Sequence, residues 1–195
     1  MNLQQRVTNI LTKPAAEWQV IAPESTDIAS LYRDYIVILA AIPAICGFIG
    51  WTMVGVTYIG RLGMGFALRG MIGSYVQALV GCYVAALVVE KLAPSFGSSG
   101  NTVQGLKLVA YAYTPIWLAG VLALVPVLTP LTLLAAIYAI YIFYLGMPPV
   151  MKTPSDKVVP YMIVSAVVII VVWIVLGFLL AAIGFVGGIG PGRMY

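Results

Sequence analysis

The sequence predicts an all-α integral membrane protein, a bundle of five transmembrane helices preceded by a short amphipathic N-terminal segment. Three observations indicate this fold class: hydrophobic residues make up 62% of the 195-residue chain, charged residues make up 8%, and the mean hydropathy is +1.05. Soluble domains contain about 25% charged residues, and a monomer of this size leaves roughly 30% of its unfolded surface exposed to water. Soluble enzymes, nucleic-acid-binding proteins and disulfide-rich secreted modules are therefore poor fits.

Residues 1–34 form the predicted cytoplasmic, interfacial segment. Its apolar residues recur on one helical face at Leu3, Val7, Ile10 and Leu11. Pro14 favours the start of a second short helix, in which Lys13 and Glu17 are expected to face water. Two interpretations stay open at this point: a membrane-surface anchor or docking helix, and a lid over the cytoplasmic ends of the spans.

Long uncharged stretches mark the spans, because a helix needs about 20 apolar residues to cross a hydrocarbon core about 30 Å thick. The predicted transmembrane domain covers residues 35–186, with spans at about 35–58, 70–89, 109–125, 131–145 and 160–183. The stretch from Leu108 to Met151 contains two of these spans, because Pro126 and Pro130 favour a tight hairpin near its middle. Residues 187–195 form a short glycine-rich C-terminal tail.

An odd number of spans places the two ends of the chain on opposite sides of the membrane. With a cytoplasmic N-terminus, most basic residues face the cytoplasm: Arg6, Lys13, Arg33, Lys91, Lys107, Lys152 and Lys157. The opposite side then carries only Arg61, Arg69 and Arg193. The positive-inside rule therefore favours a cytoplasmic N-terminus.

Small residues recur along the second predicted span, and small side chains let helix backbones approach closely in membranes. The candidate packing or interaction residues are Gly73, Ser74, Gln77, Ala78, Gly81 and Cys82. Gln77 is the most polar of them, and it either lines a pathway or hydrogen-bonds to a neighbouring helix. Cys46 and Cys82 both lie in apolar stretches, which favours packing roles over a disulfide.

Ionisable residues inside a span are the usual sign of transport or catalysis, and the predicted spans contain none. The nearest charged residues are expected at span ends, where their side chains reach the interface: Asp34, Arg69, Glu90, Lys107 and Lys157. The chain contains no histidine, metal-ligand spacing, phosphate loop or nucleophile elbow. The sequence therefore predicts no catalytic site, no cofactor and no metal site.

Two features of the third and fourth spans allow more than one interpretation. Pro115 has no amide hydrogen to donate to the Tyr111 carbonyl, so it breaks the hydrogen-bond pattern of the third predicted span. The break either exposes this backbone acceptor to a substrate or lipid, or is a kink that neighbouring helices satisfy. In the fourth span Tyr138, Tyr141 and Tyr144 lie nearly on one face, which suits packing, interface anchoring or stacking on a ligand.

Three segments together resemble the Yip1 family. The segment from Lys107 to Leu128 resembles the core segment of the family, and its motif positions are Lys107, Tyr111, Tyr113, Thr114 and Pro115. Tyr144-Leu145-Gly146, followed by Met151–Lys157, resembles the loop before the last span in the bacterial inner-membrane branch. Its motif positions are Gly146, Lys152, Asp156 and Lys157. Lys13-Pro14-Ala15-Ala16-Glu17-Trp18 is similar to the opening of that branch, so the resemblance covers nearly the whole chain.

The resemblance implies five spans, a cytoplasmic N-terminus and, for the bacterial branch, an inner-membrane protein with a periplasmic C-terminus. Eukaryotic relatives act in vesicle trafficking and bind Rab-type GTPases and one another. This chain departs from them, because its cytoplasmic head covers only residues 1–34 and has no counterpart of their longer acidic head. A GTPase partner is therefore not carried over to this chain.

The leading functional hypothesis is a non-enzymatic scaffold or accessory subunit of a membrane complex, in membrane organisation or trafficking. Such a protein would act through helix contacts and the cytoplasmic Lys152–Lys157 loop. The expected partners are the phospholipid membrane and other membrane proteins or a second copy of the chain, with no nucleic acid and no soluble substrate. The alternative is a small transporter, channel or lipid-handling protein, suggested by Pro115, Gln77 and the nearby tyrosines.

Overall fold

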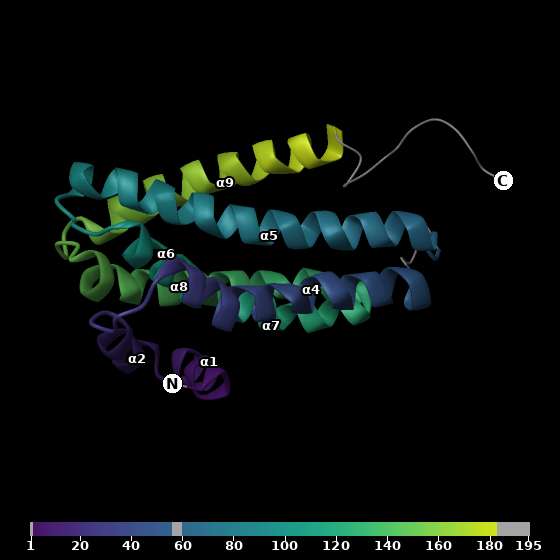
Figure 1. The fold of residues 1–195 in the computed structure, drawn as a ribbon, viewed down its shortest axis with the longest axis horizontal. Helices are drawn as coiled ribbons and strands as arrows, with labels where there is room; N and C mark the ends of the chain where they lie inside the picture. The colour runs from purple at the N-terminus through teal and green to yellow at the C-terminus, as the bar shows by residue number, and fades with distance from the viewer. Residues whose placement is uncertain (1, 56–59, 183–195) are drawn as a thin grey trace.

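The computed structural model describes residues 2–55 and 60–182. Within them, five helical segments are long and apolar enough to cross a membrane: Ile28–Val54, Met64–Phe96, Thr102–Leu124, Pro126–Met151 and Val158–Ala182. These segments run side by side along one long axis, and two short N-terminal helices lie against one flank (Figure 1). The predicted all-helical fold class with five spans is confirmed.

The two N-terminal helices are α1 (Leu3–Thr12) and α2 (Pro14–Ile21). The side chain of Asn2 caps α1 by accepting a hydrogen bond from the Gln4 amide at 3.2 Å. Pro14 occupies the first turn of α2, where its missing amide hydrogen costs no helical bond. The second helix begins at Pro14 as the sequence predicts.

The first span is a composite helix. It consists of α3 (Ile28–Leu31), the π-helical turn η1 (Tyr32–Ile36), α4 (Val37–Ile49) and a second π-helical turn, η2 (Gly50–Val54). The Asp27 carboxylate caps its start by accepting a hydrogen bond from the Ser30 amide at 2.7 Å. Hydrogen bonding to Ser30 stabilises the ionised carboxylate and lowers the pKa of Asp27.

The second span is α5 (Met64–Leu92), extended by a 3₁₀ turn, η3 (Ala93–Phe96). The third span is divided into α6 (Thr102–Ala112), α7 (Thr114–Ala119) and the 3₁₀ segment η4 (Gly120–Leu124). The division lies just before Pro115, as its missing amide requires. The hydroxyl of Thr114 donates to the freed carbonyl of Tyr111 at 2.7 Å, so the break is satisfied within its own helix.

The fourth and fifth spans are η5 (Pro126–Leu131) continuing into α8 (Thr132–Met151), and α9 (Val158–Ala182). The chain reverses at extended Val125, so the predicted proline hairpin joins the third and fourth spans as expected. The predicted fourth span, at about 131–145, is too short, because α8 continues through Pro148 and Pro149 to Met151. Buried contacts of the last α8 turn support this continuation despite the two missing donors.

The spans also extend further at their ends than the uncharged stretches indicate. The first span includes Arg33 and Asp34, which face water and pair with each other at 2.7 Å. The second span includes exposed Lys91 near its end. A helix that reaches past the hydrocarbon core can carry exposed charges in its last turns, so charge alone places the boundaries too far inward.

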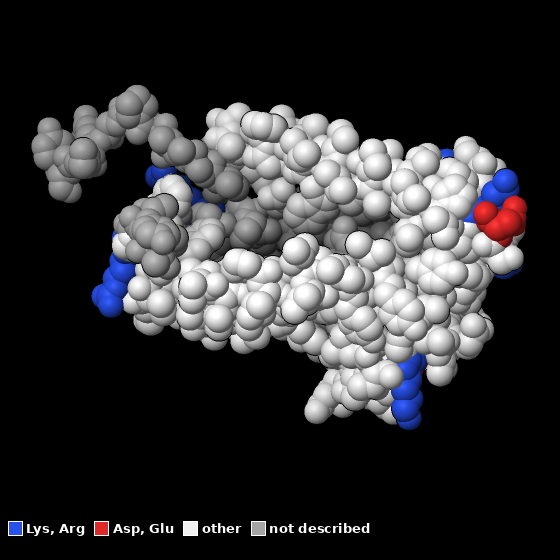
Figure 2. Space-filling model, turned by 180° about the vertical axis from the view of Figure 1, so that it is seen from behind, with Lys and Arg blue, Asp and Glu red and all other residues white. Residues whose placement is uncertain are grey.

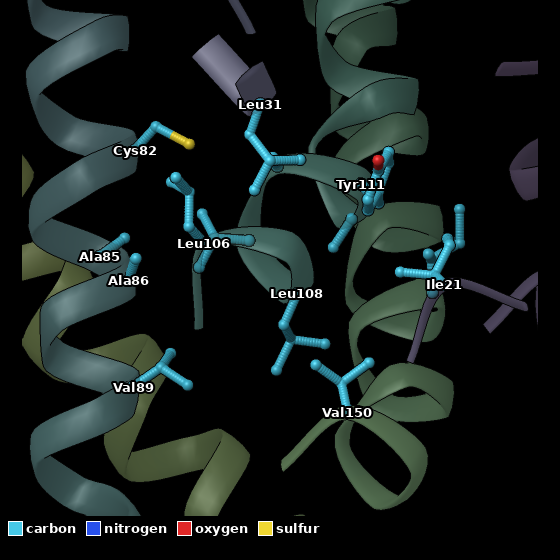
Figure 3. Packing of buried hydrophobic residues seen from close by; sticks show 14 of the residues in the cluster. Ile21, Leu31, Cys82, Ala85, Ala86, Val89, Leu106, Leu108, Tyr111 and Val150 are labelled. Carbon is cyan, nitrogen blue, oxygen red and sulfur yellow. The ribbon is translucent and has the colours of Figure 1, made fainter. Parts of the chain in front are cut away.

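The second span is the central helix of the bundle, because α5 packs against α4, α6 and α9. Figure 3 shows Cys82, Ala85, Ala86 and Val89 along the side of α5 that faces Leu106 of α6. All of these side chains are buried. Small residues of α5 therefore lie in its contact with α6, and Cys82 packs there as a free thiol.

Tyrosine hydroxyls join several helices by donating to backbone carbonyls of a neighbouring helix. These contacts run from Tyr32 to Leu79 at 2.7 Å, from Tyr75 to Val37 at 3.0 Å and from Tyr161 to Val89. A phenol combines an apolar ring with one polar atom, so it packs inside the bundle and still satisfies its hydroxyl group.

The outer surface of the bundle is apolar between its two ends. Exposed large hydrophobic side chains cover much of α8 and α9, including Leu134, Ile137, Ile170 and Phe178. Figure 2 shows charged side chains toward the ends of one face and an uncharged stretch between them. The last described turn of α9 lies at the end of the bundle away from the N-terminal helices (Figure 1). The predicted tail at 187–195 lies outside the described residues.

Candidate functional site

The N-terminal helices lie against the flank formed by α7 and α8, rather than over the ends of the spans. Ile10 and Ile21 are fully buried there, and Leu3, Val7 and Leu11 pack against the same core. The structure therefore shows this segment docked on the flank of its own bundle, which differs from the lid over the span ends that the sequence suggested as one interpretation.

Charged side chains are buried where the N-terminal helices meet the bundle. We call Arg6, Glu17, Glu24, Lys107 and Tyr111 the docking cluster. Arg6, Glu17 and Lys107 are each at most 4% exposed. Charged residues are almost never buried without partners, so these contacts determine the stability of the docked state.

Arg6 forms the centre of the docking cluster. Its Nη1 donates to Glu17 Oε1 at 2.7 Å, and its Nη2 donates to the Glu24 carboxylate. The guanidinium also lies over the Tyr111 ring, 5.5 Å from the ring centroid. Asn9 Nδ2 donates to the second oxygen of Glu17 at 3.0 Å. The buried charges of Arg6 and Glu17 are thus compensated within the protein.

Lys107 fixes the chain that leaves the second N-terminal helix. Its Nζ donates to the backbone carbonyl of Ile21 at 3.1 Å and to the carbonyl of Glu24. Ile21 is the last residue of α2 and Glu24 lies just beyond it, where backbone carbonyls lack the usual i+4 helical donor. The Glu24 amide also donates to the Ile21 carbonyl at 3.2 Å. A lysine ammonium beyond a helix C-terminus also interacts favourably with the helix dipole.

Two sequence-based expectations about these residues are wrong. Glu17 was expected to face water, but it is 4% exposed and paired with Arg6. Lys107 was expected at a span end with its side chain at the interface, but it lies inside the third span and is 2% exposed. The partner of Glu17 lies 11 residues away on the neighbouring helix α1, whereas the partners of Lys107 lie 86 and 83 residues away.

Trp18 and Gly146 form the apolar part of the docking contact. Trp18 is fully buried, and its Nε1 donates to the Ile142 carbonyl of α8 at 2.9 Å. A β-carbon on Gly146 would lie 2.6 Å from both Trp18 Cε2 and Leu108 Cδ1. Glycine is therefore the residue that lets the indole ring reach α8. Tyr111 meets the same indole edge-on, with centroids 6.1 Å apart.

Further hydrogen bonds extend this contact on both sides. The hydroxyls of Tyr35 and Thr114 lie 2.6 Å apart, which links the first and third spans. Tyr138 of the fourth span donates to the Leu11 carbonyl of α1 at 2.6 Å. Of the tyrosine stripe, Tyr138 thus contacts the N-terminal helices, whereas Tyr141 and Tyr144 are exposed.

The other motif positions lie apart from the docking cluster. Tyr113 packs edge-on against Trp117 in α7, with centroids 6.0 Å apart. Lys152, Asp156 and Lys157 are exposed in the loop after α8. Lys152 adopts a left-handed conformation with φ 51° and ends α8.

The small-residue candidates of the second span have a separate role in helix packing. Gln77 donates to the Trp173 carbonyl of α9 at 3.1 Å, and a β-carbon on Gly81 would lie 2.9 Å from the Trp173 ring. Gly73 is buried and Ala78 half-buried. Ser74 is exposed and donates to the Met71 carbonyl of its own helix at 3.0 Å.

Sequence reasoning missed Arg6 and Glu24 as members of the cluster. A signal for Arg6 is present, because Arg6 follows Leu3 by three residues and precedes Ile10 by four, which places it on the apolar face of its helix. Glu24 lies in the connection after α2 and carries no such pattern. Only the fold brings it to Arg6.

The chemistry of the cluster is that of a structural contact. The cationic groups of Arg6 and Lys107 donate to groups of the same chain. In the described parts of the chain, 2–55 and 60–182, no group of three or more cysteine, aspartate or glutamate side chains is placed to hold a metal ion.

Comparisons with known proteins give one family and two relatives. The family model described as Yip1 domain matches residues 8–188. Inner membrane protein YohC of Escherichia coli strain K12 is 27% identical over 158 residues, which cover 77% of this chain and 81% of the relative. The protein of the same name from Escherichia coli O6:H1 matches with the same identity and coverage. No solved structure matches the chain.

Proposed function

Because this chain belongs to the Yip1 family, whose domain covers residues 8–188, we propose that it is a non-catalytic scaffold or accessory subunit of a membrane complex. The chain is a polytopic membrane protein and a homologue of a bacterial inner membrane protein. Bacterial inner-membrane localisation and a role in membrane organisation are part of the proposal.

The observation that carries this proposal is the structural role of the residues at the family motif positions. Lys107 and Gly146 both hold the N-terminal helices on the bundle, and Tyr111 lies between them under Arg6. A catalytic acid, base or nucleophile must reach a substrate. Groups that are buried and saturated by their own chain instead support a rigid structural role.

Two features that suggested a transporter have internal partners. The carbonyl freed by Pro115 accepts a hydrogen bond from Thr114, and Gln77 bonds to the backbone of α9. A transport pathway usually leaves such polar groups facing a cavity. Their satisfaction within the bundle favours the scaffold over the transporter.

The proposed orientation places the N-terminal helices in the cytoplasm. The loop from Lys152 to Lys157 and the start of the first span lie at the same end of the bundle as these helices. Most of the basic residues belong to this end, so the positive-inside rule supports the assignment. The C-terminus then faces the periplasm.

The proposed contact surface consists of the exposed sides of α1 and α2 and the Lys152–Lys157 loop. Gln19 and Val20 are exposed on α2, and Lys152, Asp156 and Lys157 are exposed in the loop. Docking holds the helix backbone in place, so this surface meets a partner with little ordering cost. The partner is another membrane protein or a second copy of the chain.

Purification from native membranes in a mild detergent tests the proposal. The chain is expected to elute with a stoichiometric partner or as a homo-oligomer. The variant Lys152→Glu is expected to lower recovery of the complex by about tenfold, because a reversed charge opposes complementary charge on a partner. Lys91→Glu is the matched control, since Lys91 is an exposed cation outside the proposed surface.

A stable monomer from the gentlest extraction would contradict the scaffold. Equal losses of the complex in Lys152→Glu and Lys91→Glu would contradict the assigned surface, because a general charge effect does not depend on position.

A further inference from the structure

The half of the bundle away from the N-terminal helices contains an apolar groove with a volume of about 420 Å³. It lies between α4, α5, α7 and α9, and its lining includes Pro43, Phe48, Trp51, Ala78, Trp117 and Trp173. Figure 2 shows a hollow in the corresponding face of the molecule. Ligand pockets in proteins commonly have volumes of 300–1,000 Å³.

The arrangement of the helices produces this groove. The fifth span packs mainly on α5 and meets α8 over a short stretch only, so it diverges from the third and fourth spans. On the other side, a β-carbon on Gly120 would lie 2.5 Å from Pro43 Cβ, which shows how closely η4 approaches α4. Tight packing on one side and divergence on the other leave the space between them.

The surroundings of the groove determine what can occupy it. Its lining residues come from all five spans, and the exposed surface around it is apolar. In a membrane, the apolar surface around the groove faces the hydrocarbon core, so the molecules that reach the groove from the side are lipid chains. An unfilled groove would forfeit the dispersion contacts of its lining, which an acyl chain restores.

Charge at the same end of the bundle selects the kind of lipid. Among the described residues of this end, the charged side chains are Arg61 and Arg69, and both are exposed. All six acidic residues of the chain belong to the opposite end: Glu17, Glu24, Asp27, Asp34, Glu90 and Asp156. The Leu62 amide donates to the Trp51 carbonyl at 3.0 Å, so Arg61 lies beside a residue that lines the groove.

We propose that the groove binds an acyl chain of an anionic phospholipid, with the lipid phosphate at the end of the bundle that carries Arg61 and Arg69. The bound lipid comes from the leaflet opposite the N-terminal helices. This site is independent of the scaffold proposal, because it uses neither the docking cluster nor the Lys152–Lys157 loop.

Tryptophan fluorescence reports on the groove directly. Three of the four tryptophans of the chain line it, namely Trp51, Trp117 and Trp173. The fourth, Trp18 of α2, is fully buried between the N-terminal helices and the bundle and supplies a constant background. The full-length protein is reconstituted in phosphatidylcholine vesicles, and phosphatidylglycerol with a brominated acyl chain, which quenches tryptophan on contact, replaces an increasing fraction of the lipid.

Brominated phosphatidylglycerol is expected to reach half of the maximal quenching at a mole fraction at least about fivefold lower than brominated phosphatidylcholine, since each arginine near the anionic headgroup contributes about that factor. The double variant Arg61→Gln with Arg69→Gln is expected to bring the two curves together without lowering maximal quenching. Coinciding curves for the parent protein would overturn the anionic assignment.

Filling the groove provides the second arm. A β-carbon on Gly47, which lines the groove, meets no atom within 4 Å, so Gly47→Leu places a side chain in the space without a backbone clash. We expect it to remove the preference for brominated phosphatidylglycerol. Gly65→Leu is the matched control, because a β-carbon there also meets no atom within 4 Å and Gly65 is exposed outside the groove.

Two outcomes decide this arm. Loss of the preference in Gly47→Leu but not in Gly65→Leu supports the site, and unchanged quenching in Gly47→Leu overturns it. Both variants are compared with the parent by gel filtration and circular dichroism. If Gly47→Leu does not fold, Ala44→Leu fills the same groove from the next turn of α4.

Discussion

Replacing Arg6 with methionine is expected to release the N-terminal helices from the bundle. Methionine retains the apolar stem but leaves the Glu17 carboxylate, whose side chain is 5% exposed, without its cation. Breaking a buried ion pair from one side costs about 3–5 kcal/mol. Chymotrypsin is then expected to cleave after Trp18, which is fully buried in the docked state, and the thermal unfolding midpoint in detergent should fall.

The Arg6→Met experiment has a control and a rescue. Gln5→Met changes the neighbouring, exposed residue of the same helix and is expected to leave protease resistance unchanged. The double variant Arg6→Met with Glu17→Leu is expected to recover much of the loss, because it leaves no buried ion without a partner; the Glu24 carboxylate, which also loses Arg6, is 37% exposed and can be hydrated. Cleavage of Arg6→Met at the parental rate would show that the pair does not hold the helices.

Replacing Trp18 with alanine is expected to have an effect of similar size. The change removes a fully buried indole and its hydrogen bond to the Ile142 carbonyl. Truncation of a buried tryptophan to alanine costs about 3–5 kcal/mol, because it leaves a cavity as well as lost contacts. Denaturant unfolding of the purified protein measures this loss, and Trp18→Phe should lose less because it keeps a ring in the cavity.

The same contact can be tested from the bundle side with Gly146→Ala. The new methyl group would lie 2.6 Å from the indole and from Leu108, and overpacking of this kind costs about 1–3 kcal/mol. Gly177→Ala is the control, since its nearest neighbour would lie at an ordinary 3.6 Å. Trp18→Ala and Gly146→Ala should not add, because removing the indole relieves much of the clash. Additive losses would place the two residues in separate contacts.

The spans are predictable because the bilayer imposes a simple physical condition. Any stretch that crosses it must be long, apolar and helical, and the hydropathy of this chain shows such stretches directly. Proline positions also act locally, so the hairpin after Leu124 and the break before Pro115 follow from the sequence. The small residues of α5 likewise mark its central place in the bundle.

The docking cluster is less predictable because it depends on contacts between distant segments. Lys107 looks like an ordinary basic residue near a span end, and only the carbonyls of Ile21 and Glu24 show why it lies inside. Glu17 likewise has no visible reason to be buried until Arg6 is placed beside it. Burial of a charge is a property of the pair, and a single sequence does not specify the pair.

Hydrogen–deuterium exchange of the full-length protein in a bilayer of zwitterionic lipid tests the central claim most directly. The claim is that α1 and α2 are held on the bundle itself, by contacts of Arg6 and Trp18 of these helices and of Lys107 of the third span. It predicts that amides of α1 and α2 exchange slowly without any anionic lipid, and that Arg6→Met abolishes this protection. Rapid exchange in the parent protein, or protection that appears only with anionic lipid, would contradict it and show a membrane-surface helix instead.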